Sequence, residues 1–222
     1  MLRTQTVEKR TLDLIKRLMS DPTFHDFNLV GGTALALKIG HRLSVDIDLF
    51  SANPFDAPAI AAHLQATHDA KDIGTIKNGV FCFIDKIKID LIAHQYRLVN
   101  DIDLNDGIRS VSLGDIAAMK LNAIYNNGSR LKDFVDMYAL LDLFTLNQML
   151  LTCHQKYPDL DLDIVKRSLT YFADIDFTNP VKFIGQEIPW SVIAERLKAA
   201  TVRPNVLASE LAKEKRSKGR RL

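Results

Sequence analysis

A chain of 222 residues with 47% apolar and 25% charged residues is long enough to form one large domain or two small ones around a buried core. It contains no apolar run of membrane-spanning length and no apolar block typical of a signal peptide, so we expect no contact with a membrane. Cys82 and Cys153 lie far apart and outside any metal-binding spacing, which predicts reduced core thiols in a cytoplasmic protein.

The net charge of +2 is unevenly distributed along the chain. Residues 211–222 contain six Lys or Arg and one Glu, which leaves the rest of the chain mildly acidic. A basic tail on such a body indicates contact with a polyanion such as RNA. A solvated terminus without any partner explains the same composition equally well.

The first half of the chain alternates between helical and strand patterns. Apolar spacing predicts a helix over residues 6–19, which ends before Asp21-Pro22, and an alanine-rich helix within residues 54–67. Between them, residues 27–30 form a predicted strand, residues 33–39 a helix that Gly40 caps, and residues 45–50 a second strand. On that strand Val45, Ile47 and Leu49 share one face.

Two further strands are expected after Asn78-Gly79, over residues 80–84 and 87–93, as antiparallel neighbours of the 45–50 strand. From Ser112 the pattern becomes helical only, with Ser112 and Asp115 in the positions of a capping pair. The predicted helices cover residues 113–126, 129–144, 146–156, 161–173 and 189–200. We therefore expect an α+β protein that divides into residues 1–110 and a helical part over residues 111–222.

Three aspartates are the most informative acidic residues. Asp46 and Asp48 are two residues apart in a strand, so both side chains leave the same face, and Asp90 lies in the 87–93 strand. If these strands are neighbours, the carboxylates converge, and burying such like charges unpaired is costly. A divalent cation, Mg²⁺ or alternatively Mn²⁺, resolves the conflict.

A glycine turn precedes these aspartates. Gly31 and Gly32 let the backbone approach a triphosphate closely, and Thr33 lies where the next helix begins, with its free N–H groups directed at anions. Taken alone, Asp46 and Asp48 are more simply read as solvent-facing residues of a half-exposed strand. The order and spacing of the glycine turn, the aspartate pair and Asp90 favour the phosphoryl-transfer interpretation.

One lysine in the helical half lies where an apolar residue is expected. Lys120 is four residues from both Ile116 and Ile124 and therefore lies within the apolar stripe of its helix. An inward lysine needs an anion, either a carboxylate or a phosphate, although a side chain that snorkels to solvent is the alternative. Arg130 and Asp133, on the next helix, form at their simplest a surface ion pair.

At these residues the chain resembles the nucleotidyltransferase toxins of the AbiEii/AbiGii family, within the DNA polymerase β-like superfamily. The resemblance covers roughly half of the chain, in the order of the family's motifs. The matching stretches are Leu29-Val-Gly-Gly-Thr-Ala-Leu-Ala-Leu37, His41-Arg-Leu-Ser-Val-Asp-Ile-Asp-Leu-Phe50, Lys88-Ile-Asp90, Asp115-Ile-Ala-Ala-Met-Lys120 and Arg130-Leu-Lys-Asp-Phe-Val-Asp-Met-Tyr138.

The resemblance implies a mixed β-sheet nucleotidyltransferase core with flanking helices, followed by a C-terminal helical bundle. It also implies roles for individual residues. The metal ligands would be Asp46, Asp48 and Asp90; the phosphate-binding residues would be Gly31, Gly32, Thr33, Arg42, Ser44, Arg130 and Lys132; and Lys120 and Asp133 would join the catalytic set.

The leading hypothesis is a Mg²⁺-dependent enzyme that transfers NMP from NTP to RNA, for example the 3′ end of tRNA, or to a protein hydroxyl. The resemblance implies a toxin that acts with a separate antitoxin protein. Two other hypotheses stay open: a nucleotide-binding regulatory module without turnover, and a protein-interaction component with a vestigial site. The acceptor of the nucleotide is left open by the sequence of residues 146–222, in which only the basic tail favours RNA.

Overall fold

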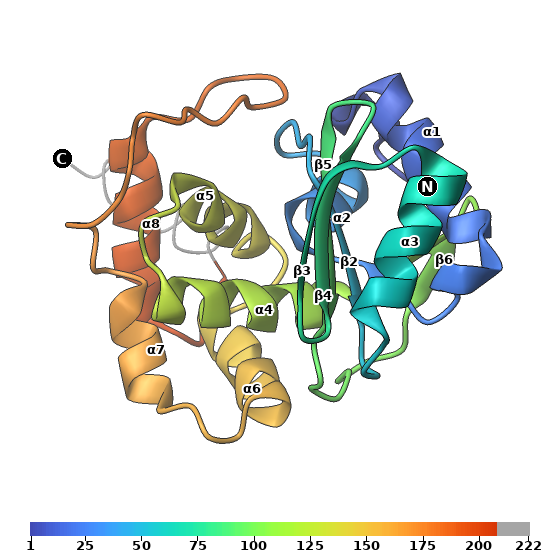
Figure 1. Cartoon of the computed structure of the whole chain (residues 1–222). Coiled ribbons are helices and arrows are strands. Elements are labelled where there is room, and N and C mark those ends of the chain that lie inside the picture. The colour runs from blue at the N-terminus through green and yellow to red at the C-terminus, as the bar shows by residue number, and fades with distance from the viewer. Residues whose placement is uncertain (208–222) are drawn as a thin grey trace, which may run out of the picture. The chain divides into compact units, whose positions relative to one another are not determined.

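The computed structural model describes residues 1–207 of the chain, so the basic segment 211–222 lies outside the described residues (Figure 1). The chain divides into two compact units, Met1–Ile116 and Ala117–Leu222. The boundary falls inside α4 (Leu113–Asn126). Each unit is described by itself below.

The first unit is built on one mixed seven-stranded sheet of order β3-β4-β5-β2-β1-β7-β6. Its strands pair antiparallel except for β1 with β7 and β2 with β5, which are parallel. The strands are β1 (Asn28–Leu29), β2 (Ile47–Ser51), β3 (Lys71–Ile76), β4 (Gly79–Ile84), β5 (Ile87–Ala93), β6 (Asp103–Asn105) and β7 (Ile108–Ser110). The predicted α+β class is confirmed.

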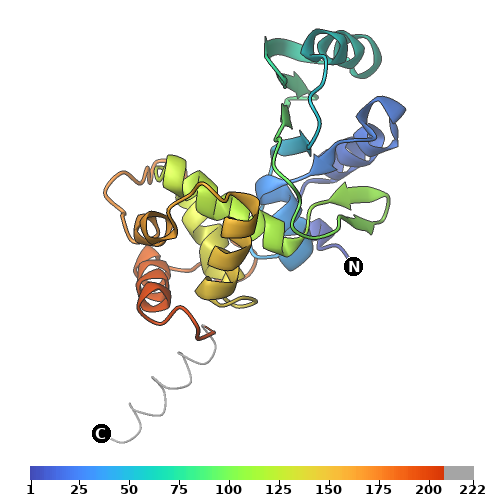
Figure 2. The same cartoon turned by 90° about the horizontal axis from the view of Figure 1, so that it is seen from below.

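Three α-helices precede α4 in the first unit. They are α1 (Lys9–Ser20), α2 (Gly31–Ile39) and α3 (Ala57–His68), with short 3₁₀ turns at η1 (Thr4–Thr6) and η2 (Pro22–Phe24). In this unit α3 packs on β3 and β4, α1 on β7 and α2 on β2 (Figure 1). The β6–β7 hairpin lies at the end of the sheet opposite β3 (Figure 2).

The strand direction beside β2 differs from the prediction. We expected antiparallel strands there, and β4 with β5 does form an antiparallel hairpin, but β5 runs parallel to β2. A parallel pair needs a long crossover connection, which α3, β3 and β4 supply between the two strands. The strand also begins at Ile47 and not at Val45, so Val45 lies before it and is 59% exposed.

Three strands, which are short or exposed, were not predicted from the sequence. Strand β3 is exposed along most of its length, and β6 and β7 have three residues each, so none has the apolar alternation that identifies a strand. Their turns carry clearer signals. Asn78, Asp106 and Gly107 all adopt positive φ, as tight hairpin turns require.

The second unit is helical, as predicted from residue 112 onward. After α4 come α5 (Leu131–Leu140), α6 (Leu146–Lys156), α7 (Leu162–Ser168) and α8 (Trp190–Val202). Edge-to-face aromatic contacts link these elements, because Trp190 of α8 packs against Phe134, Phe172 and Phe177 at centroid distances of 5.1–6.0 Å. Of these four aromatic residues, Phe134 is fully buried and Phe177 is exposed, so the cluster extends from the core to the surface of the unit.

Both cysteines are buried free thiols, as expected. Burial raises the pKa of the Cys82 thiol to about 11, with a contribution from the Asp90 carboxylate, and burial alone raises the pKa of Cys153 to about 11. Such thiols are protonated and unreactive near neutral pH. Among the described residues, no helix combines the length and apolar character needed to cross a bilayer.

The start of α4 depends on a buried carboxylate. Asp115 is fully buried and accepts hydrogen bonds from Val99 N at 3.0 Å, Asn100 N at 3.1 Å and the Ser112 hydroxyl at 2.8 Å. The predicted capping pair is thus present, and it also fixes the preceding loop.

We expect Asp115→Ala to lower the free energy of unfolding by about 2–4 kcal/mol, because it leaves several backbone donors unsatisfied. Urea denaturation measures the change. Asp101→Ala, at an exposed position of the same loop, is the matched control and should stay within about 0.5 kcal/mol of the wild type. Equal losses in the two variants would contradict the role of Asp115.

Candidate active site

The pairing of β2 with β5 sets two of the predicted aspartates opposite each other. In the parallel register Asp48 faces Asp90, with Ile47 opposite Ile89 and Leu49 opposite Leu91. The flanking apolar residues are buried, whereas the aspartates are half-buried on the other face of the sheet. The predicted convergence of Asp48 and Asp90 is therefore built into the register.

Asp46 lies just before the first residue of β2 and is also half-buried. Within residues 1–207, Asp21, His63 and His68 form the one set of His, Cys or carboxylate side chains whose ligand atoms lie within 4.8 Å of one another. Asp46, Asp48 and Asp90 therefore lie near one another at β2 and β5, but their carboxylate oxygens do not all lie within 4.8 Å of one another. Mutual repulsion between carboxylates opposes a closer approach.

The two glycines of the turn are required because neighbouring side chains leave no space for a Cβ atom. Gly31 has φ +69°, and a Cβ at this position would lie 2.4 Å from Asp48 Oδ2. A Cβ on Gly32 would lie 2.3 Å from Arg42 Nη2 and 3.4 Å from the Ser44 hydroxyl. The start of α2 therefore lies directly against the Asp48 side chain and the Arg42–Ser44 segment.

The first turn of α2 is tied to the segment that enters β2. The Thr33 hydroxyl lies 2.9 Å from the Ser44 hydroxyl and also contacts the Asp46 carbonyl oxygen. Val30 N donates to Asp48 O at 2.9 Å, which joins the residue before the helix to the strand. Because the N–H groups at the start of α2 have no partners within the helix, this corner is suited to bind an anion.

Arg42, which the resemblance places among the phosphate-binding residues, is buried. It is 4% exposed, and its Nη1 donates to the Leu43 carbonyl at 2.9 Å. The guanidinium is therefore packed beside the first turn of α2. A buried arginine at this position adds positive charge to the helix N-terminus.

The Asp90 carboxylate has one paired and one unpaired oxygen. Oδ2 forms an ion pair with Lys88, while Oδ1 is buried and has no hydrogen-bond partner among the described residues. An unsatisfied buried oxygen costs free energy unless a donor or a cation reaches it. Together with the hard carboxylate donors of Asp46 and Asp48, it fits a Mg²⁺ site.

The anion that inward-facing Lys120 requires consists of two carboxylates. Lys120 is 6% exposed, and its Nζ lies 2.7 Å from Asp133 Oδ1 and 2.6 Å from Asp136 Oδ2. The neighbouring Ile116, Ala117, Leu121 and Ile124 are buried, as the stripe predicts. Snorkelling is excluded for this lysine.

The interpretation of Arg130 and Asp133 as a simple surface pair is wrong. Arg130 Nε does lie 2.8 Å from Asp133 Oδ2, but Asp133 is 1% exposed and shares its other oxygen with Lys120. Asp133 belongs to the first turn of α5, where a negative charge is favoured. Lys132, which the resemblance places among the phosphate-binding residues, is exposed.

Asp136 was missed as a member of this cluster. It is fully buried and contacts Lys120. Its spacing of three residues from Asp133 places both carboxylates on one face of α5, which is the signal that would have identified it. Lys120, Asp133 and Asp136, with Arg130 at the edge, form a buried ion-pair cluster in the second unit.

We expect Gly31→Ala to destabilise the protein by about 1–2 kcal/mol, because alanine disfavours positive φ. The new Cβ would displace the Asp48 carboxylate. Gly74→Ala is the control, since nothing lies within 4 Å of a Cβ there. Thermal melts of both variants test this, and a Gly31→Ala variant as stable as Gly74→Ala would contradict the contact.

We expect Lys120→Met to lower the free energy of unfolding by about 3–5 kcal/mol, because it leaves two buried carboxylates without their cation. Lys132→Met, at an exposed position nearby in the sequence, should change it by no more than about 0.5 kcal/mol. Chemical denaturation followed by circular dichroism gives both values. If Lys120→Met were as stable as the control, the cluster would not contribute to stability as inferred.

Comparisons with known proteins identify the family of this chain. Residues 13–169 match the model of the family described as nucleotidyl transferase AbiEii toxin, type IV toxin–antitoxin system. An uncharacterised protein of Aquifex aeolicus (strain VF5) is 31% identical over 177 residues, which cover 76% of this chain and 84% of that protein.

Two solved structures are similar at low sequence identity. An antigenic nucleotidyltransferase-like protein from Paracoccidioides brasiliensis is 17% identical with a TM-score of 0.48, over 72% of this chain and 94% of that one. JHP933 from Helicobacter pylori is 14% identical with a TM-score of 0.46, over 89% and 97% of the two chains. On the family match over residues 13–169, the chain belongs to the AbiEii nucleotidyltransferase toxin family.

Proposed function

We propose that this protein transfers NMP from an NTP to an RNA hydroxyl, with the 3′ end of tRNA as the favoured acceptor, and acts as the toxin of a toxin–antitoxin pair. The proposal is supported by membership of the AbiEii family. The observation that carries the chemistry is the register that sets Asp48 opposite Asp90, with Gly31 packed against the Asp48 carboxylate.

The reaction forms one bond and breaks one bond at the α-phosphorus. The acceptor hydroxyl oxygen bonds to Pα, the bond between Pα and the bridging oxygen to Pβ breaks, and pyrophosphate leaves. Asp46, Asp48 and Asp90 would hold Mg²⁺, or Mn²⁺ in its place. When bound, the ion supplies positive charge for the phosphate oxygens.

The other residues of the first unit would bind and orient the nucleotide. The N–H groups at Gly31, Gly32 and Thr33 would donate to phosphate oxygens at the start of α2, with Ser44 and Arg42 beside them. Asp90 would accept the proton of the acceptor hydroxyl, since one of its oxygens has no hydrogen-bond partner among the described residues. The roles that the family resemblance implies for Lys120, Arg130, Lys132 and Asp133 stay predictions.

RNA is favoured over a protein hydroxyl as acceptor because of the basic composition of residues 211–222. This support comes from the sequence, as the segment lies outside the described residues. The family description, a type IV toxin–antitoxin system, supports a separate antitoxin protein as a partner.

We expect purified protein to incorporate label from an α-³²P-labelled NTP into tRNA in the presence of Mg²⁺. The double variant Asp46→Asn/Asp48→Asn should lose the transfer by more than about 10³-fold while remaining folded, because it removes carboxylate charge without changing side-chain size. The control is Asp101→Asn/Asp106→Asn, which changes two exposed aspartates and should keep full activity.

The assay includes each of the four NTPs, total tRNA and total cell protein, so that the label reports the acceptor. Label in a protein band instead of RNA would overturn the RNA assignment while supporting NMP transfer. Nucleotide binding without transfer to any acceptor would favour the regulatory-module hypothesis. Transfer that is unchanged in the double variant would overturn the proposed roles of both aspartates.

A further inference from the structure

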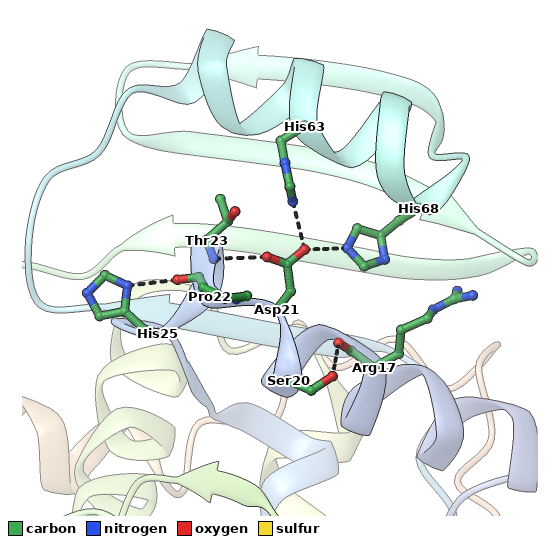
Figure 3. Close-up of polar contacts among 8 residues, drawn as sticks. All are labelled: Arg17, Ser20, Asp21, Pro22, Thr23, His25, His63 and His68. Carbon is green, nitrogen blue, oxygen red and sulfur yellow. Dashed lines mark hydrogen bonds and ion pairs between the residues drawn. The ribbon is translucent and has the colours of Figure 1, made fainter.

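A second group of metal-ligating side chains lies in the first unit, apart from the residues discussed above. Asp21 follows α1 and precedes η2, while His63 and His68 belong to α3. Figure 3 shows both imidazole rings directed from α3 at the Asp21 carboxylate. In the sequence Asp21 is 42 positions from His63 and 47 positions from His68, and the fold brings the three together.

The two histidines converge on a single oxygen atom. His63 Nε2 lies 2.7 Å and His68 Nε2 lies 2.8 Å from Asp21 Oδ2. The Asp21 side chain is 11% exposed and that of His68 is 4% exposed, whereas that of His63 is 31% exposed. The ligand atoms therefore lie in a nearly buried position that is open to solvent on the His63 side.

Neighbouring groups hold each ligand in place. The second Asp21 oxygen accepts a hydrogen bond from Thr23 N at 2.9 Å, which orients the carboxylate (Figure 3). The buried Phe24 ring packs against both imidazoles, with centroids 5.7 Å and 5.8 Å away. Arg109 holds the loop that carries Asp21 through the carbonyls of Met19, Phe24 and Phe27. The Asp21 carboxylate is therefore oriented by a backbone group, as outer-shell partners orient the carboxylates of metal sites.

The Asp21 carboxylate is paired with side chains that are not permanently charged. Among the described residues, its ion-pair partners are histidines and include no Lys or Arg. Arg17, which is close by in Figure 3, pairs with Asp85 instead. A carboxylate that is this buried requires a counter-charge.

We propose that Asp21, His63 and His68 bind a divalent transition metal ion of the Zn²⁺ class, with water as the fourth ligand. Two imidazole nitrogens and one carboxylate oxygen are ligands that Zn²⁺, Co²⁺ and Ni²⁺ accept, whereas Mg²⁺ prefers oxygen alone. The site is therefore chemically distinct from the aspartates of β2 and β5. It would fasten the segment after α1 to α3.

Metal binding requires a small opening of the group. Bonds of about 2.0–2.2 Å to a tetrahedral ion place ligand atoms about 3.3 Å apart. Each nitrogen would then move roughly half an ångström away from Asp21 Oδ2. The part-exposed His63 has room for this movement. The competing interpretation is a metal-free polar cluster in which both imidazoles donate to the carboxylate.

One feature of His68 is common to both interpretations. Its Nδ1 is buried and has no hydrogen-bond partner among the described residues, whether Nε2 faces the Asp21 carboxylate or a metal ion. The titration below therefore decides between them.

The test is a titration of tag-free, chelator-treated full-length protein with Co²⁺, followed by its visible absorption, and with Zn²⁺ by calorimetry. We expect one ion per chain and a higher melting temperature with Zn²⁺. His63→Gln and Asp21→Asn should weaken binding by at least about tenfold, since even the loss of an outer-shell partner costs that much. His25→Gln, at an exposed histidine outside the group, should bind like the wild type.

Circular dichroism shows whether each variant is folded. If Asp21→Asn does not fold, the part-exposed His63→Gln variant still tests the site. Absence of Co²⁺ and Zn²⁺ binding at micromolar concentrations would overturn the site and leave the metal-free cluster. Unchanged affinity in His63→Gln would also overturn it. Competition by millimolar Mg²⁺, or loss of Zn²⁺ binding in Asp46→Asn/Asp48→Asn, would place the ion at the other aspartates instead.

Discussion

The parallel pairing of β2 with β5 is the constraint on which the candidate site depends. It places Asp48 opposite Asp90 at the spacing of neighbouring strands, where two carboxylates repel each other. The fold tolerates this because the apolar residues on the opposite face, including Ile47, Ile89 and Leu91, are fully buried. Burial of that face fixes the register, since a shift by one residue would move the apolar set to the other face.

The start of α2 is built around the same pair. Gly31 is required by its positive φ and by the closeness of the Asp48 carboxylate, while Gly32 leaves space for the Arg42 guanidinium. The Thr33 hydroxyl contacts Ser44 and the Asp46 backbone, so hydrogen bonds join the helix N-terminus to the aspartate-bearing segment. An anion-binding helix end beside carboxylates suits a substrate that brings both phosphate charge and a metal ion.

The buried charges of the second unit are arranged differently. Lys120 is neutralised by Asp133 and Asp136 within the protein, so its inward position is explained without a ligand. Asp21, by contrast, has two imidazoles and one backbone N–H as partners, and its cluster of ligand atoms is the tightest in the described part of the chain. A buried charge is therefore a candidate ligand site only when the protein does not already supply a permanent opposite charge.

The sequence alone predicted the α+β class, the helical second half, the strand positions of Asp48 and Asp90 and the inward position of Lys120, because all of these follow from local periodicity and spacing. The tertiary structure decided the rest. The parallel direction of β5, the burial of Arg42 and Asp133, and the role of Asp136 depend on which elements become neighbours. The meeting of Asp21 with His63 and His68 depends on the packing of the α1–η2 segment against α3, and no spacing along the chain records such a contact between residues more than forty positions apart.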